Sequence, residues 1–302
     1  MTRFSAETLD LSRFPAPLAI RGIDYEAILS ARKSRFVEIA TSKGLAYDVQ
    51  GLETDPVVIV EETDAYREML VVAAVNDAVR AVMIAFAIGA DLEHLAAFYG
   101  VSRRIVGYET TGDLAPILES DDELRRRTLL APEAFAAAGP RGAYVFHALS
   151  ADPRVVNVDV WTSGPGKVEV AVQSREGDGA APDDLVEAVR ARLHRDDIKP
   201  LTDMVSVRSI ANIPYQVIGT GYVLPGPDPI AVRDQAIAAI EAMAISRRTP
   251  ARDVPRSAVF AAASVGPMDK VVLDQPVADV ARGYGEVALL TAVDFKVVSY
   301  AG

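Results

Sequence analysis

Apolar residues recur at helical spacing through the first third of the chain, from residue 55 to about Tyr99. Asp55-Pro56 is a strong helix start, because Asp caps the first turn and Pro is tolerated at the first helical position. Neither Gly nor Pro follows before Gly89. The pattern therefore predicts one helix of about forty residues, against an average of ~11–12.

Two apolar stripes run side by side along this predicted helix. The first alternates steps of four and three residues, as in a coiled-coil seam, and is the predicted bundle interface. It comprises Ala65, Met69, Val72, Asn76, Val79, Met83, Phe86 and Ala90. The second comprises Val71, Val75, Ala78, Val82, Ala85 and Gly89. Two adjacent stripes indicate a helix covered on more than one side, as in a bundle of three or more helices.

The chain itself offers only short helical partners for such a bundle, at residues 24–46 and 119–138. Neither covers forty residues, so we infer that other chains complete the bundle. Asn76 lies in the seam, where one polar residue typically fixes register and oligomeric state at a cost in stability. Asn76→Leu is then expected to raise bundle stability. The alternative is a bundle within one chain, with Asn76 bonded to a local backbone group.

A second helix start lies at Ser120, where Ser120 and Glu123 form a capping box. Three consecutive arginines, residues 125–127, fall inside this helix. They could form a polyanion site. We favour solvated arginines that pair with the acidic residues 121–123 at helical spacing.

From residue 143 the pattern alternates between strands and helices. Predicted strands lie at residues 155–161, 167–173, 205–210, 215–223, 270–273 and 287–298, and predicted helices at 182–195, 228–247 and 256–263. The fold class is α+β: an N-terminal long-helix bundle region followed by two small strand–strand–helix–strand domains. The expected domains are an N-terminal arm with short helices (1–54), the helical core-bundle region (55–142), and α+β domains at 143–224 and 225–302.

Composition and charge narrow the function classes. The formal charge of −11 argues against non-specific nucleic-acid binding, and the absence of cysteine excludes disulfides and thiolate chemistry. The apolar stretch 69–90 contains Asn76, Asp77 and Arg80 and predicts a buried helix rather than a membrane span. The N-terminus lacks an apolar core of signal-peptide length, which favours a cytosolic product.

No motif for catalysis survives inspection. The three histidines share no short motif, and Gly164-Pro165-Gly166-Lys167 lacks both the first glycine and the Ser or Thr of a phosphate-binding loop. We therefore expect no catalytic residue, cofactor or metal site. The residues alone indicate a non-enzymatic assembly protein.

Several segments together resemble a known family. They are Glu53-Thr54-Asp55-Pro56, Tyr66-Arg67, Val75-Asn76-Asp77-Ala78, residues 87–92, residues 119–127, residues 139–144 and Lys199-Pro200-Leu201-Thr202-Asp203. Their order and spacing resemble the baseplate J-like proteins of contractile phage tails, from about residue 15 to the C-terminus. The departures are small: Thr54 where Ser is expected and Glu93 where Asp is expected.

The resemblance implies a wedge subunit in the baseplate of a phage, a prophage-derived bacteriocin or a related contractile injection particle. Two copies and one neighbouring wedge protein would form a heterotrimer through the long helices. Six wedges would surround the hub, joined into a ring by the C-terminal domains and lying close to the sheath. Assembly would take place in the host cytoplasm, without nucleic acid or membrane. A tail-associated hydrolase and a sheath or tube component are the alternatives.

A ring that holds the sheath extended and then rearranges needs joints between rigid bodies. The candidate hinges are Gly139, Pro140 and Gly142, and a second, stiffer joint at Pro225, Gly226 and Pro227. Ordinary surface turns are the alternative for both.

Overall fold

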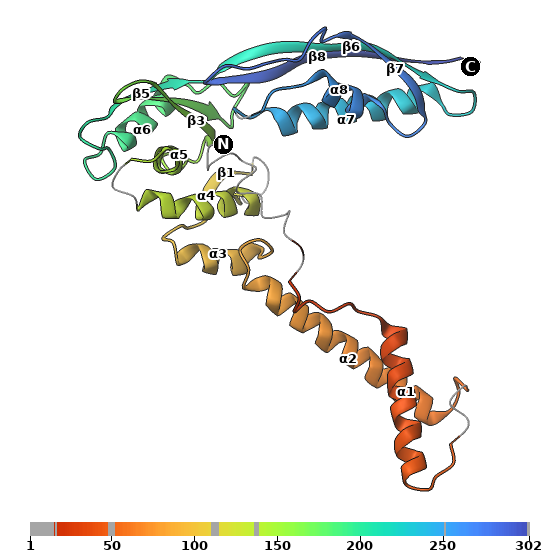
Figure 1. Ribbon diagram of the computed structural model, residues 1–302. Coiled ribbons are helices and arrows are strands. Elements are labelled where there is room, and N and C mark those ends of the chain that lie inside the picture. The colour runs from red at the N-terminus through yellow and green to blue at the C-terminus, as the bar shows by residue number, and fades with distance from the viewer. Residues whose placement is uncertain are drawn as a thin grey trace. The chain divides into compact units, whose positions relative to one another are not determined.

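The computed structural model describes residues 15, 17–47, 52–109, 115–135, 139–250 and 252–300 (Figure 1). These residues fall into two compact units, a helical unit up to residue 102 and an α+β unit from residue 103. The first fourteen residues of the expected N-terminal arm lie outside the described residues.

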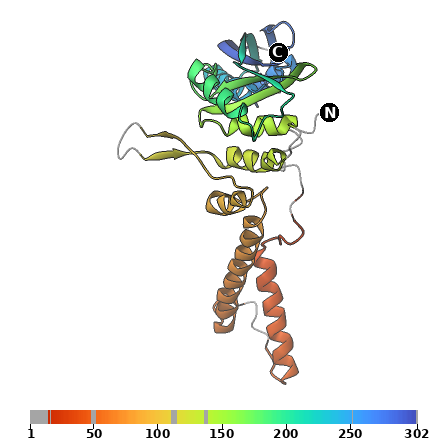
Figure 2. The ribbon, with the colours of Figure 1, turned by 90° about the vertical axis from the view of Figure 1, so that its left-hand side faces the viewer.

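The helical unit consists of two helices that pack against each other and a short third helix that follows them. Its helices are α1 (Tyr25–Ser42), α2 (Pro56–Ala81) and α3 (Gly89–Ala97). The Asp24 side chain accepts a hydrogen bond from the Ala27 N–H, and Asp55 accepts one from the Val57 N–H. These caps satisfy N–H groups that the first helical turn leaves unpaired. Figure 2 shows α1 lying alongside α2.

The predicted forty-residue helix is wrong, because the chain breaks it into α2 and α3. Helix α2 ends at Ala81, and the Met83 carbonyl accepts the N–H groups of Phe86 and Ala87 in a tight turn. Gly89 has φ +54°, a left-handed conformation that favours glycine. Residues 82–88 are rich in β-branched side chains, which favour helices less. Met83, Phe86 and Ala90 therefore do not continue the stripe on α2.

The α+β unit begins with a hairpin and two helices. The hairpin strands are antiparallel, and the elements are β1 (Ile105–Tyr108), β2 (Pro116–Leu118), α4 (Asp121–Ala134) and α5 (Arg141–Leu149). The Ser120 hydroxyl accepts the Glu123 N–H, which confirms the predicted cap of α4. Helices α4 and α5 pack together, and α5 lies against the first sheet.

The first sheet has the order β3-β4-β5, and a helix connects its parallel strands. The elements are β3 (Val155–Gly164), β4 (Lys167–Ser174), α6 (Asp183–Leu193) and β5 (Met204–Ser209). The predicted hairpin is confirmed as β3 and β4, and the crossover helix as α6. Tyr144, Val170 and Leu185 are fully buried in the core between this sheet and helices α5 and α6.

The second sheet has the order β7-β6-β8 with two helices packed on it. The elements are β6 (Ala211–Val223), α7 (Pro229–Arg247), α8 (Arg256–Ala263), β7 (Met268–Gln275) and β8 (Glu286–Ser299). Val217, Ile240 and Phe295 are buried in its core. Because β6 pairs with β7 and β8, residues 211–223 belong to this sheet, whereas the expected boundary between the two α+β domains lay at residue 224.

Close contacts connect the two sheets of the α+β unit. The Asp159 carboxylate on β3 accepts the Gly285 N–H at 2.9 Å and pairs with Arg141 at 2.9 Å. Gly285 has φ +69°, and a Cβ there would lie 2.8 Å from the Trp161 ring. Tyr284 stacks on that ring, with centroids 5.7 Å apart. These contacts join the two sheets within the α+β unit.

Across the described ranges, no helix combines the length and the apolar character that crossing a bilayer requires. Within the same ranges, no group of three or more His, Asp and Glu side chains is placed to hold a metal ion.

Candidate assembly interface

The first predicted stripe packs inside its own helical unit. Ala65 is fully buried and Asn76 is 3% exposed, while Met69, Val72 and Val79 are half-buried. Helix α1 covers part of this face. Within the chain, this contact buries Ala65 and Asn76 and leaves the other members of the stripe partly or fully exposed, so packing of the stripe against other chains stays a prediction.

Asn76 is bonded to a backbone group of its own chain, as the alternative interpretation required. Its Oδ1 accepts the Arg21 N–H at 3.0 Å, and its Nδ2 donates to the Arg21 carbonyl at 2.9 Å. Both polar ends of the side chain are thus satisfied without a second chain. We therefore expect Asn76→Leu to lower stability instead of raising it, because Leu would lose both hydrogen bonds.

Arg32 on α1 holds the two helices together by charge, a contact that sequence reasoning missed. Its guanidinium pairs with Glu61 at 2.8 Å, Asp64 at 3.1 Å and Glu68 at 3.1 Å on α2. These acids recur at three- and four-residue steps and so share one helix face. This spacing is the feature of the sequence from which an acidic helix face could have been predicted. The hydrogen bond that Arg32 donates to the Glu68 carboxylate is the largest cause of the raised pKa of Arg32.

The N-terminal cap of α2 is tied to the preceding loop. The Tyr47 hydroxyl donates to the Asp55 carboxylate at 2.6 Å, which raises the pKa of Tyr47 to about 12. The same bond lowers the pKa of Asp55 below its usual value of 3.8. The cap therefore stays ionised, and able to accept helix N–H groups, well into the acidic range.

The second predicted stripe lies at the surface. Val71, Val75 and Val82 are 62%, 51% and 71% exposed. Further exposed apolar side chains on α2 are Ile59, Val60, Tyr66 and Leu70. Exposed apolar side chains grouped along a helix are suited to packing against another chain. We call this set, Val60, Val71, Val75 and Val82 with Ile59, Tyr66 and Leu70, the open face of α2.

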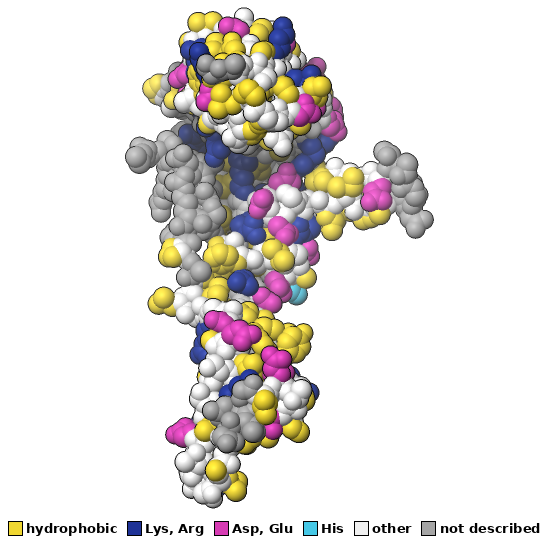
Figure 3. All heavy atoms as spheres, turned by 90° about the vertical axis from the view of Figure 1, so that its right-hand side faces the viewer, with side chains coloured by type: hydrophobic (Ala, Val, Ile, Leu, Met, Phe, Trp, Pro, Cys, Tyr) yellow, Lys and Arg dark blue, Asp and Glu magenta, His cyan; other side chains and the backbone are white. Residues whose placement is uncertain are grey.

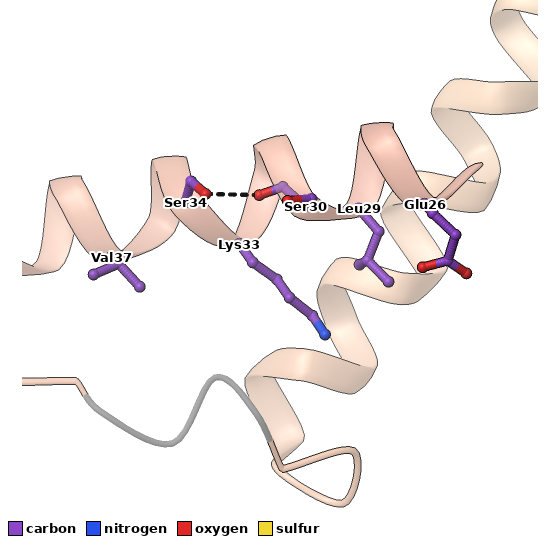
Figure 4. A pocket seen from close by; sticks show the side chains of 6 residues that line it. All are labelled: Glu26, Leu29, Ser30, Lys33, Ser34 and Val37. Carbon is purple, nitrogen blue, oxygen red and sulfur yellow. Dashed lines mark hydrogen bonds between the residues drawn. The ribbon is translucent and has the colours of Figure 1, made fainter. Parts of the chain in front are cut away.

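A groove with a cavity of about 540 Å³ runs along α1. Its lining residues are Glu26, Leu29, Ser30, Lys33, Ser34 and Val37. Figure 4 shows Glu26, Leu29, Lys33 and Val37 pointing to the same side of the helix. The three- and four-residue steps between them place these side chains on one face of α1.

The arginine run on α4 behaves differently from the solvated set that we favoured. Arg125 does pair with Asp122 at 2.7 Å, as expected. Arg127 is instead buried, and it pairs with Glu119, which is 1% exposed, at 3.3 Å. Burial lowers the pKa of Arg127 to about 10. The expectation that all three are solvated is therefore wrong: Glu119, one residue before the cap, draws Arg127 inward.

The first candidate hinge lies in packed structure. Pro140 caps α5 and Gly142 is buried inside that helix. Gly139 has φ +60°, and a Cβ there would lie 2.6 Å from Pro200 Cγ. Only glycine fits at residue 139, and the role of the segment as a hinge stays a prediction.

The second candidate hinge, Pro225-Gly226-Pro227, joins β6 to α7. Nothing lies within 4 Å of a Cβ built on Gly226. The two elements that flank the loop nevertheless belong to the same sheet-and-helix core, because α7 packs on β8 and β8 pairs with β6. The loop thus joins elements of one core, and its role as a hinge stays a prediction.

The fold thus combines an α+β unit that has its own buried cores with a helical unit that exposes apolar side chains along α2. Such exposed side chains are suited to assembly with other chains. Family comparison agrees. Residues 53–110 match the baseplate J-like N-terminal domain, and residues 136–209 match the baseplate J-like central domain. The central-domain match ends just before β6, where the strand pairing also changes sheet.

Baseplate protein J of Escherichia phage P2 is 34% identical to this chain over 301 residues, covering 96% of this chain and 97% of the relative. The chain belongs to the baseplate J-like family. The resemblance inferred from the sequence motifs is thereby confirmed.

Proposed function

We propose that this chain is a structural wedge subunit of a contractile-tail baseplate, and that the open face of α2 packs against helices of partner chains. The partners are a second copy and a neighbouring wedge protein, in a 2:1 complex. Membership of the baseplate J-like family supports the baseplate role. The observation that supports the helical contact is the exposure of Val71 and Val75 on one side of α2, together with that of Val82 at its C-cap.

Physical reasoning favours a helical partner for this face. Helix α1 has 18 residues and already occupies the face that carries Ala65. Exposed valines along a helix lose contact with water when a second helix packs on them, at about 25 cal/mol per Å² of apolar area. The steps between Val71, Val75 and Val82 are those of residues that meet a helix lying alongside.

Six such wedges would then join into a ring around the hub, close to the sheath. The Asp159–Gly285 junction supports movement of the α+β unit as one piece when the ring rearranges. Assembly in the host cytoplasm and a mechanical, non-enzymatic role complete the proposal. A phage, a bacteriocin or another injection particle could carry such a wedge.

The test is Val75→Asp in the full chain, co-expressed with the adjacent tail proteins. A charge inside a helical bundle is costly, so co-purification of the partners should fall at least about tenfold. The matched control is Ile230→Asp, which introduces the same charge at an exposed position in the first turn of α7.

Loss of the partners with Val75→Asp, and their retention with Ile230→Asp, is the expected result. If both variants retain the partners, the open face of α2 is not the assembly surface. If the wild-type chain alone polymerises into tubes, the protein is instead a sheath or tube component.

A further inference from the structure

The hairpin β1–β2 carries apolar side chains with nothing packed over them. Ile105 pairs with Leu118 and Tyr108 with Pro116, and all four are exposed, Tyr108 at 60%. Figure 2 shows the hairpin extending away from the helices and sheets of the α+β unit, and Figure 3 shows hydrophobic side chains over its described part. An isolated two-stranded hairpin is marginally stable in water, so this arm is suited to a partner.

The base of the arm is firmly held. The Glu119 N–H donates to the Arg104 carbonyl at 2.8 Å, and Arg103 donates to the Glu119 carbonyl at 2.6 Å. The Glu119 carboxylate lies buried between Arg104 and Arg127, at 3.5 Å and 3.3 Å. The arm therefore leaves the α+β unit in a direction that the buried ion cluster fixes.

The same unit carries a cavity of about 340 Å³ at the junction of its sheets. Its main walls are Tyr144, Val160, Trp161, Val168 and Tyr284. This volume lies in the range of pockets that accept a bulky group, roughly 300–1,000 Å³. An aromatic or branched side chain at the surface of another protein would fit between these apolar and aromatic residues.

The charges of the arm and of the pocket are complementary. The described residues of the arm, 105–109 and 115–118, include the exposed acidic Glu109 and no Lys, Arg or His. Arg141 is the charged side chain among the described residues that line the pocket; it is 37% exposed and gives one nitrogen to Asp159. The arm is apolar and carries Glu109, and the pocket is aromatic and carries Arg141. The two surfaces are therefore complementary in charge.

We infer that the β1–β2 hairpin of one copy docks in the aromatic pocket of the α+β unit of a neighbouring copy. The arm and the pocket are different surfaces, so the contact is head-to-tail and repeats from copy to copy. A closed ring forms where the rotation between copies closes. This inference rests on the proposed function, which supplies several copies side by side.

The absence of cysteine makes a site-specific test possible. Glu109→Cys labels the arm and Thr162→Cys labels the pocket, both at exposed positions. Assembled baseplates that contain both variants are treated with a short bismaleimide. We expect covalent dimers from the mixture, at a yield at least about tenfold above that of Glu109→Cys paired with the control Ser206→Cys, as for a specific over a random contact. Ser206 is exposed on β5, at the opposite edge of the sheet.

Three outcomes would overturn the docking. They are dimers from Glu109→Cys alone, which indicate arm-to-arm contact; attachment of the arm only to a different protein; and no yield above that of the control.

A second variant separates this inference from the proposed function. Tyr108→Ser should leave the 2:1 wedge intact and lower the yield of complete baseplates about tenfold, as truncation of a central aromatic contact does. Unchanged baseplate yield would contradict the docking while leaving the wedge proposal standing. Failure of the wild-type chain to form any wedge would contradict the proposed function instead.

Discussion

The α+β unit and the helical unit differ in how completely they satisfy their own residues. In the α+β unit, two clusters of fully buried side chains lie between sheets and helices. In the helical unit, α2 buries Val58, Ala65 and Asn76, while its open face remains in water. The difference indicates that the sheets and helices of the α+β unit form complete cores within the chain, whereas α2 of the helical unit leaves apolar side chains that the chain itself does not cover.

The largest expected effect lies in the α+β unit, at the buried ion cluster. Glu119→Gln leaves Arg127 and Arg104 without their carboxylate partner, which should lower the free energy of unfolding by about 3–5 kcal/mol. Chemical denaturation monitored by circular dichroism measures it. The control is Glu123→Gln, whose partner Arg175 lies at the surface and whose cost should stay below about 1 kcal/mol. Equal costs would mean that the cluster stabilises nothing.

A leucine pair tests the contrast between the units directly. Leu185 on α6 is fully buried, so Leu185→Ala should cost about 2–5 kcal/mol. Leu70 on the open face of α2 is 48% exposed, so Leu70→Ala should change stability by less than about 0.5 kcal/mol in the isolated chain. The same denaturation curves compare both. A large cost for Leu70→Ala would show that the chain itself already covers the open face.

Asn76 tests whether the buried face of α2 is internal. Asn76→Leu removes two hydrogen bonds to the Arg21 backbone, so the helical unit should lose about 1 kcal/mol. Hydrogen exchange across α2 reports the change locally. Asp77→Leu, at the adjacent exposed position, is the matched control. Increased protection in Asn76→Leu would restore the interpretation of Asn76 as a polar residue in an interchain seam.

The smallest expected effect is a pH dependence in the α+β unit. Burial, and secondarily the charge of Arg192, lower the pKa of His147 below its ordinary 6.5. The unfolded chain therefore binds a proton first as the pH falls below 6.5, and stability decreases until the folded pKa is passed. His147→Gln should flatten the melting temperature between pH 7 and pH 5 compared with the wild type. An identical slope in both proteins would exclude His147 as the cause.

Local features were predictable from the sequence because their causes are local. The caps at Asp55 and Ser120 satisfy N–H groups two or three residues away, and both occur where expected. The β3–β4 hairpin and the crossover helix α6 were likewise predicted from alternation and turn residues. The family was also predictable, because its motifs are short and ordered.

Contacts between distant residues were not predictable. The partner of Asn76 lies 55 residues away at Arg21, and no spacing rule indicates it. The burial of Arg127 depends on Glu119 and on the packing of α4 against α5. Helix α2 ends at Ala81, and α3 begins at Gly89 in a left-handed conformation; periodicity encodes neither the end nor the new start. Periodicity alone therefore predicted the wrong helix length, and the parts of both apolar stripes beyond Ala81 do not lie on α2.

The most direct test of the central claim is light scattering coupled to size-exclusion chromatography. The full chain is measured alone and after co-expression with the neighbouring tail gene. The account predicts a soluble monomer or dimer that becomes a 2:1 complex, in which the α2 amides gain protection from hydrogen exchange. A monomer that binds neither itself nor any tail protein would contradict the claim that the open face of α2 is an assembly surface.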